Sequence, residues 1–165
     1  MKNLYTLLTF SALFFTNLIF AQATANFTAS VTIIQPIGIT TTSNMNFANV
    51  DARNGGLITL SPNNTRNSYG DVKLADGGSI SAASFEVTGE QGYTYTVTVP
   101  SDDYVLSNGS ESIIINDFTT DFKSDNALAA GSQTINVGAT LEVNPNQTPG
   151  NYVSQGGLDV TVNYN

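Results

Sequence analysis

Residues 135–143 read Ile-Asn-Val-Gly-Ala-Thr-Leu-Glu-Val, with an apolar side chain at every odd-numbered position. Successive side chains of a β-strand point to opposite faces of the sheet. The alternation therefore places one apolar face against a core and one polar face in water. One-sided strands of this kind are typical of antiparallel sheets. We predict a half-buried antiparallel strand at this position.

The same alternation recurs along the chain. Three further runs are long and regular: Ala25–Ile33, Tyr93–Val99 and Leu158–Tyr164. Shorter strands are predicted at Ile37–Thr41, Leu57–Leu60, Val72–Leu74, Ser84–Thr88 and Ile113–Phe122. In the last of these, Ile113 and Ile115 fall on one parity, and Phe118 and Phe122 fall on the other. This shift predicts a β-bulge near Asn116-Asp117, because one extra residue restores the alternation.

These strands set the expected fold class. Turns rich in glycine, asparagine and aspartate separate the runs, and the polar stretch Ser61–Gly70 is expected to be an exposed loop. About eight or nine antiparallel strands without crossover helices predict an all-β, immunoglobulin-like two-sheet sandwich. A closed barrel is the alternative architecture.

The N-terminal residues have the features of a cleaved secretory signal peptide over residues 1–23. Lys2 precedes an apolar run that ends at Phe20, and the small residues Ala21 and Ala23 stand where a signal peptidase cleaves. We expect cleavage after Ala23, with Ala21 as the alternative site. Threonines and an asparagine interrupt the apolar run, and no positive cluster follows it. A retained membrane anchor is therefore the less favoured interpretation.

The remaining chain, residues 24–165, is expected to form a single β-sandwich domain with an acidic surface. Without Lys2, four basic residues stand against thirteen acidic ones, a net charge of −9. Such a surface repels phosphate backbones and anionic lipids. We therefore expect neither nucleic acid nor, after signal cleavage, a membrane as partner. The expected location is outside the cytoplasm: secreted, in the periplasm or on the outer cell surface.

The sequence offers little catalytic equipment. It contains no histidine and no cysteine, which removes Ser-His-Asp and Cys-His arrangements. No predicted helix places a serine beside Lys73 or Lys123. Paired carboxylates could serve a glycosidase, but the candidate acids lie in polar, turn-rich segments where solvated surface acids are the simpler interpretation. These acids are Asp102, Asp103, Glu111, Asp117 and Asp121. We expect a protein that is not an enzyme.

Calcium is the ion that the acidic loops could bind, because it accepts carboxylate and carbonyl oxygens. The loops to inspect are Asp51–Gly55 and Asp121–Asp125. The first contains Arg53 and lacks the closing acid of an EF-hand loop, and neither has a recognised ligand spacing. We therefore expect no cofactor, with calcium as the one ion to test.

The C-terminal region carries a motif. Gly150 and Tyr152 precede a terminal alternating strand with Val160, Val162 and a penultimate Tyr164. This ending resembles that of chaperone–usher fimbrial subunits and of spore-coat-protein-U-like domains. Together with the stretch from Val137 to Leu141, it is more closely similar to the DUF-4402 family of exported bacterial domains. The fimbrial glycine usually lies nearer the C-terminus, and the fimbrial cysteine pair is absent.

The resemblance to fimbrial subunits implies a structural or adhesive surface protein. In that class an N-terminal strand of one subunit completes the sheet of the next, and this chain is expected to self-associate or to bind another surface protein. The alternating side chains that could serve as plugs are Phe27, Ala29, Val31 and Ile33. The simpler expectation is that Ala25–Ile33 is the first strand of its own sandwich. The alternative function is a stand-alone binding module for a glycan or a protein.

Overall fold

The computed structural model describes residues 22–123 and 127–165. The predicted signal peptide lies almost wholly outside this part. The chain divides into two units, Met1–Ile33 and Ile34–Asn165. The second unit is the compact domain, and the described residues of the first, 22–33, are called the arm below. No helix in the described ranges is long and apolar enough to cross a membrane.

The domain is built from β-strands, of which the described residues form twelve. Their bounds are β1 Gly38–Ser43, β2 Val50–Asp51, β3 Gly56–Leu60, β4 Arg66–Gly70, β5 Lys73–Leu74, β6 Ala83–Thr88, β7 Tyr95–Thr98, β8 Tyr104–Ser107, β9 Ser112–Thr120, β10 Ser132–Val143, β11 Val153–Ser154 and β12 Thr161–Tyr164. All pairings are antiparallel. The predicted all-β antiparallel sandwich is confirmed.

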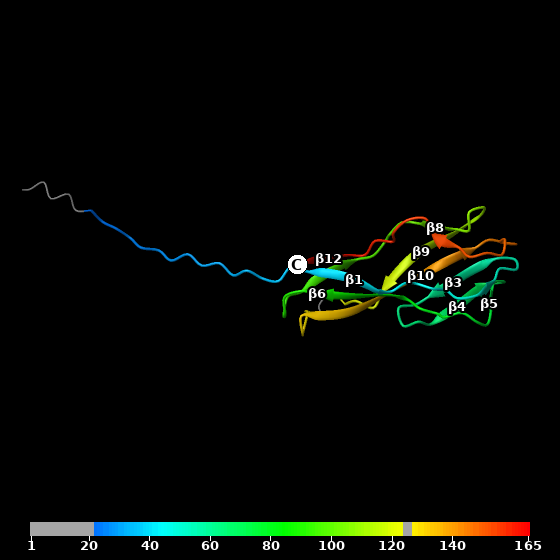
Figure 1. Cartoon of the computed structure of the whole chain (residues 1–165), viewed down its shortest axis with the longest axis horizontal. Helices are drawn as coiled ribbons and strands as arrows, with labels where there is room; N and C mark the ends of the chain where they lie inside the picture. Colours follow the sequence, from blue (N-terminus) through cyan, green and yellow to red (C-terminus); the bar gives the residue numbers. More distant parts are fainter. Residues whose placement is uncertain (1–21, 124–126) are drawn as a thin grey trace, which may run out of the picture. The chain divides into compact units, whose positions relative to one another are not determined.

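The central strand is β10, which runs through the main sheet in Figure 1. Its first half, Ser132–Val137, pairs with β6, and its second half, Ala139–Val143, pairs with β3. Strand β9 also pairs with β10, from Val137 onward. Because Val137 pairs with β6 and β9 at once, those two strands lie on opposite edges of β10. It follows that β6 and β3 share one edge, end to end.

Gly138 lies at the point where β6 gives way to β3. A Cβ atom at this position would lie 2.1 Å from the carbonyl oxygen of Leu60 and 2.9 Å from the nitrogen of Pro62. These are backbone atoms of the segment that leaves the sheet after β3, so they cannot rotate aside as a flexible side chain could. A glycine in a strand interior often marks such a close backbone approach. Gly138 thus lies within the alternating stretch of β10 and allows the backbone of the segment after β3 to pass close to that strand.

Two apolar clusters fill the domain, and β10 contributes to both. The larger cluster is built on β3, β8, β9 and the second half of β10. The smaller one, called the end cluster below, lies between the β7–β12 sheet and the strands β1, β6 and the first half of β10. Its fully packed members are Val87, Tyr95, Leu128, Ile135 and Val162.

The expected bulge is present in β9. Its pairing with β10 shifts between Gly138 and Thr140, so that the two residues after Asn116 stand opposite the single residue Ala139. Asp117 takes a positive φ of 47°, as local backbone reversals in bulges require. The prediction from the phenylalanine and isoleucine parities is therefore confirmed.

Two expectations about individual segments are wrong. Ala25–Ile33 forms no strand, because its alternation identifies a face to be buried but not the strand that would bury it. The stretch Ser61–Gly70 is not all loop, because its second half is β4. Its sequence has no regular alternation of apolar and polar side chains, because it is a marginal strand that pairs only with β3. The short strands β2, β8 and β11 were also not foreseen.

Replacing Gly138 with alanine should destabilise the domain by about 2–3 kcal/mol, because the new methyl group overpacks against backbone. The measurement is the free energy of unfolding by urea. Gly156→Ala is the matched control, because no atom lies within 4 Å of the Cβ it would add. Equal stability of the two variants would contradict the close crossing at β10.

Candidate strand-addition site

The arm presents apolar side chains to solvent. Phe27, Val31 and Ile33 are 91%, 86% and 91% exposed, and Ala29 is also exposed. No charged residue occurs in residues 22–33. Full burial of one such large side chain is worth roughly 1.5–3 kcal/mol. Burial of the proposed plug side chains would therefore be strongly stabilising, and the arm does not bury them by itself.

Three hydrogen bonds join residues at the root of the arm, within the compact domain. The backbone N–H of Gln35 donates to Glu90 Oε2 at 2.8 Å, and the hydroxyl of Tyr164 donates to the carbonyl oxygen of Gln35 at 2.8 Å. The same hydroxyl accepts the N–H of Glu90 at 2.5 Å. Gly89 leaves room for this arrangement, since a Cβ there would lie 2.3 Å from the Tyr164 hydroxyl. We call this set of contacts the root clamp.

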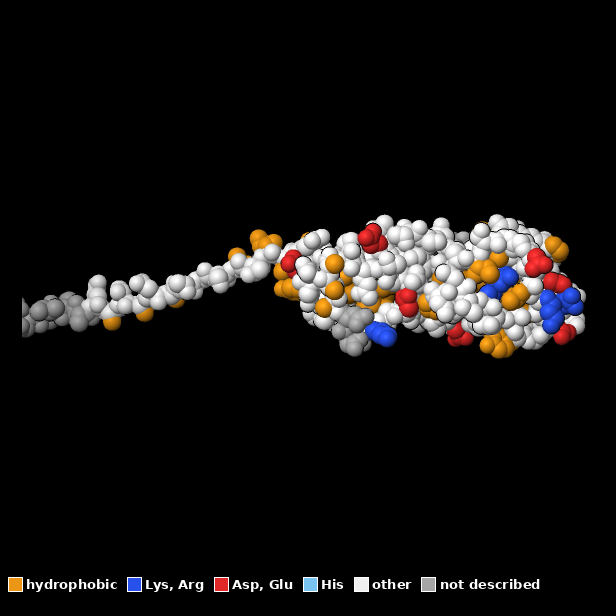
Figure 2. All heavy atoms as spheres, turned by 90° about the horizontal axis from the view of Figure 1, so that it is seen from below, with side chains coloured by type: hydrophobic (Ala, Val, Ile, Leu, Met, Phe, Trp, Pro, Cys, Tyr) orange, Lys and Arg blue, Asp and Glu red, His pale blue; other side chains and the backbone are white. Residues whose placement is uncertain are grey.

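The end cluster beside the root clamp is incompletely covered. Seven hydrophobic side chains that pack against it are only partly buried: Ile37, Ile39, Phe85, Val97, Phe122, Val160 and Tyr164. Figure 2 shows hydrophobic side chains reaching the surface around the end of the domain that holds β1, β6 and β12. The cluster still contains a fully buried Tyr95, whose pKa is raised by burial and, to a lesser extent, by the Asp121 carboxylate. This end of the sandwich therefore leaves part of its apolar surface uncovered.

The C-terminal motif is divided between the two clusters. Val160, Val162 and Tyr164 belong to the end cluster. Tyr152 packs instead on the larger cluster, and its hydroxyl donates to the Thr148 carbonyl oxygen at 2.7 Å. Gly150 lies in the same loop, where a Cβ would approach the amide side chain of Asn108. The five motif residues therefore do not form one site.

The loop that holds Tyr152 is fastened by Glu111. This carboxylate accepts the Thr148 hydroxyl at 2.7 Å and the Thr148 N–H at 3.0 Å. These hydrogen bonds lower the pKa of Glu111. Gln147 Nε2 bridges Glu111 and the Tyr152 hydroxyl, at 3.0 Å from each. Glu111 thus has a structural role in this loop.

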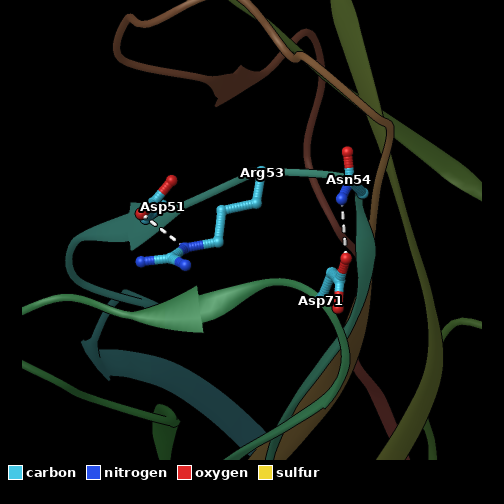
Figure 3. Close-up of polar contacts among 4 residues, drawn as sticks. All are labelled: Asp51, Arg53, Asn54 and Asp71. Atoms are coloured by element: carbon cyan, nitrogen blue, oxygen red, sulfur yellow. Dashed lines mark hydrogen bonds and ion pairs between the residues drawn. The ribbon is translucent and has the colours of Figure 1, made fainter.

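The first candidate calcium loop has its carboxylates engaged by protein groups, as Figure 3 shows. Arg53 Nε lies 2.9 Å from Asp51 Oδ2, and Asn54 Nδ2 donates to Asp71 Oδ2 at 2.7 Å. Arginine at the centre of the loop supplies the positive charge that a cation would supply. Among the described residues there is no group of three or more potential metal-ligating side chains of the His, Cys, Asp and Glu types.

The second candidate calcium loop is described only in part, since residues 124–126 lie outside the described ranges. Asp121 bonds to Asn136, accepting its backbone N–H and its side-chain amide, both at 2.8 Å. Both carboxylate oxygens are therefore hydrogen-bonded within the domain.

The remaining candidate catalytic residues lie on separate elements. Asp102 and Asp103 are exposed in the loop before β8, and Asp117 is exposed in the β9 bulge. Lys73 lies in β5 and Lys123 is exposed after β9.

Comparison with known proteins agrees with this architecture. The family model DUF4402, described as a domain of unknown function, matches residues 37–164. The chain belongs to this family. The DUF4402 match begins at β1 and ends within β12, so it falls inside the compact domain and excludes the arm. Searches of the curated proteins and of the solved structures found no match.

Two residues that matter at the root clamp were not foreseen from the sequence. Gln35 and Glu90 are separated by 55 positions, so their contact cannot be read from spacing. The usable signal was Tyr164, because a partly buried tyrosine hydroxyl usually finds a hydrogen-bond partner. The sequence identified the tyrosine but not its partners.

Tyr164→Phe removes the hydroxyl of the root clamp and should lower the free energy of unfolding of the DUF4402 domain by about 1–2 kcal/mol, since one donor and one acceptor lose their partner. Chemical denaturation provides the measurement. Tyr93→Phe is the matched control, because its ring lies 5.6 Å from that of Tyr164 but its hydroxyl bonds to no described residue. If both variants lost the same stability, the clamp would be energetically irrelevant.

Glu111 predicts a pH dependence of the DUF4402 domain. The hydrogen bonds from Thr148 lower its pKa in the fold below the ordinary value of a glutamate, so its stabilisation is present above that ordinary value and is lost as the pH falls through the folded-state pKa. The melting temperature of the native chain should therefore exceed that of Glu111→Gln at neutral pH, and the gap should narrow in acid. Glu86→Gln is the control, because Glu86 is exposed and its side chain bonds to no described residue. A gap independent of pH would contradict this assignment.

Proposed function

We propose that this chain is an exported, non-enzymatic structural or adhesive surface protein that assembles by β-strand addition. The observation that carries the proposal is the arm, where four alternating apolar side chains are exposed and uncharged. An extended segment of this kind gains main-chain hydrogen bonds and side-chain burial when it joins the edge of another sheet. The arm is the donor segment of this mechanism.

Removal of the predicted signal peptide would determine when the arm becomes available for assembly. Cleavage after Ala23 leaves the new N-terminus only a few residues before Phe27. The arm is then a free chain end, which can enter a sheet edge without threading a loop. Assembly is thereby restricted to the exported form of the protein.

The arm deletion tests the proposal. The mature chain, residues 24–165, should form concentration-dependent multimers, and deletion of residues 24–33 should leave a folded monomer, because the deleted residues lie outside the compact domain. Light scattering after size-exclusion chromatography measures the mass. A single substitution, Val31→Asp, should have the same effect as the deletion, since it would bury a charge at a plug position.

Thr32→Asp is the matched control, because it adds the same charge at the neighbouring position, on the opposite face of the arm. It should leave assembly nearly intact. A mature chain that stays monomeric at high concentration would overturn the proposal. The function to test next would then be the stand-alone binding module, by thermal shift against a glycan panel.

A further inference from the structure

We propose that the arm of one copy adds to the free edge of β12 in a second copy. This inference rests on the proposed function and names its acceptor. Strands β1 and β12 both border the end cluster, one in each sheet, and they are neighbours in space at the same end of the domain (Figure 1). The acceptor is therefore the edge of β12 at the margin of the end cluster, beside β1.

Both margins are unpaired in the described structure. There β1 pairs with β6 and β12 with β7, which leaves one free edge on each strand. Natural proteins usually protect free edges with charged residues, prolines or bulges. Neither strand contains a charged residue or a proline, and β1 has a bulge only at its far end, between Thr41 and Ser43. These two edges are open to pairing.

The register of β12 indicates which groups await a partner. The N–H of Asn165 donates to the carbonyl oxygen of Thr94 on the β7 side, at 3.2 Å. Hydrogen-bonded and non-bonded residues alternate along an antiparallel pair. The N–H and C=O groups of Val162 and Tyr164 therefore point away from β7, toward the free edge. Their side chains belong to the end cluster, so an added strand would meet both backbone partners and an apolar surface there.

The arm matches this surface in chemistry. Its plug residues alternate with Thr28, Ser30 and Thr32, so that one face can enter the end cluster while the other stays in water. The partly buried side chains near this edge are apolar, Ile37 and Ile39 from the β1 side and Val160 from the β12 side. No side chain of the arm, β1 or β12 is charged, so burying these side chains costs no charge desolvation.

The other free margin of the main sheet is a poorer acceptor. In the described residues β4 pairs with β3 alone. Its inner residue Arg66 donates to the backbone carbonyls of Asn49 and Ala75. The cluster behind it has nine buried members, against five in the end cluster. A strand added at β4 would gain backbone hydrogen bonds but little apolar burial.

The root clamp favours a second copy over the arm's own domain. To pair with its own β1, the arm would have to turn back within residues 34–37. The clamp holds this segment, because both the backbone N–H and the C=O of Gln35 are already bonded in it. Pro36 further restricts the turn because its ring fixes φ.

Cysteine pairing between two chains tests the acceptor, and the native chain has no cysteine to interfere. One chain carries a single arm cysteine, placed in turn by Thr28→Cys, Ser30→Cys and Thr32→Cys. The other lacks residues 24–33 and carries Asn163→Cys on the outer face of β12. Neighbouring strands bring facing Cβ atoms close enough for a disulfide. We expect one arm position to give a mixed disulfide in at least about tenfold higher yield than the other two.

Asn67→Cys in the arm-deleted chain is the matched control, because it is equally an exposed residue of an edge strand, on β4. Its yield should be at least about tenfold lower than that of Asn163→Cys. Equal yields, or multimers that form without any crosslink to Asn163, would overturn the acceptor while leaving strand addition in place. If the mature chain formed no multimers at all, the proposed function itself would be overturned.

Hydrogen exchange gives a second measurement that needs no substitution in the domain. A synthetic peptide of residues 24–34 is added to the arm-deleted chain. The amides of Val162 and Tyr164 should exchange at least about tenfold more slowly with the peptide bound, because they gain a partner. The amide of Asn165 is the internal reference, since it is already bonded to Thr94. If the peptide bound without slowing amide exchange at Val162 and Tyr164, the β12 edge would be excluded as the acceptor.

Discussion

The fold depends on one strand that must pair with two partners along the same edge. In β10, the first half is bonded to β6 and the second half to β3, and the exchange of partners occurs at Gly138. The crossing segment after β3 passes so close that only a residue without a side chain fits. Because β10 contributes to both apolar clusters, its register sets the packing of the whole domain.

The two clusters differ in how far the chain itself completes them. The larger cluster is built on β3, β8, β9 and the second half of β10, and nine of its members are buried. The end cluster has five, and its sheets stop at the free edges of β1 and β12 in the described residues. One domain thus combines a larger buried core with a smaller one that lies beside two free strand edges. The family match spans both, so the free edges belong to the DUF4402 region of the chain.

The sequence predicted the strands that have one wet face and one buried face, because their side-chain parity records the pleat. Thus β10, β9 with its bulge, β7 and β12 could be found in advance. Strands such as β4 could not, since their pairing relies on backbone groups that every residue has. Ala25–Ile33 shows the reverse problem, in which the parity is clear but the chain provides no partner strand. Among the site residues, Tyr164 was identified from its position, whereas Gln35 and Glu90 became visible only when the fold brought them to it.

The root clamp also determines how an assembled fibre would carry force. It bonds the start of the arm, at Gln35, to the C-terminal strand, through Tyr164. In a row of subunits, tension would enter one domain at its β1–β12 margin and leave through the arm that begins beside that margin. The mechanical path would then cross only the end cluster, loading its strands lengthwise so that many hydrogen bonds resist together. The larger cluster and its loops would bear no load, and their sequences could diverge without weakening the fibre.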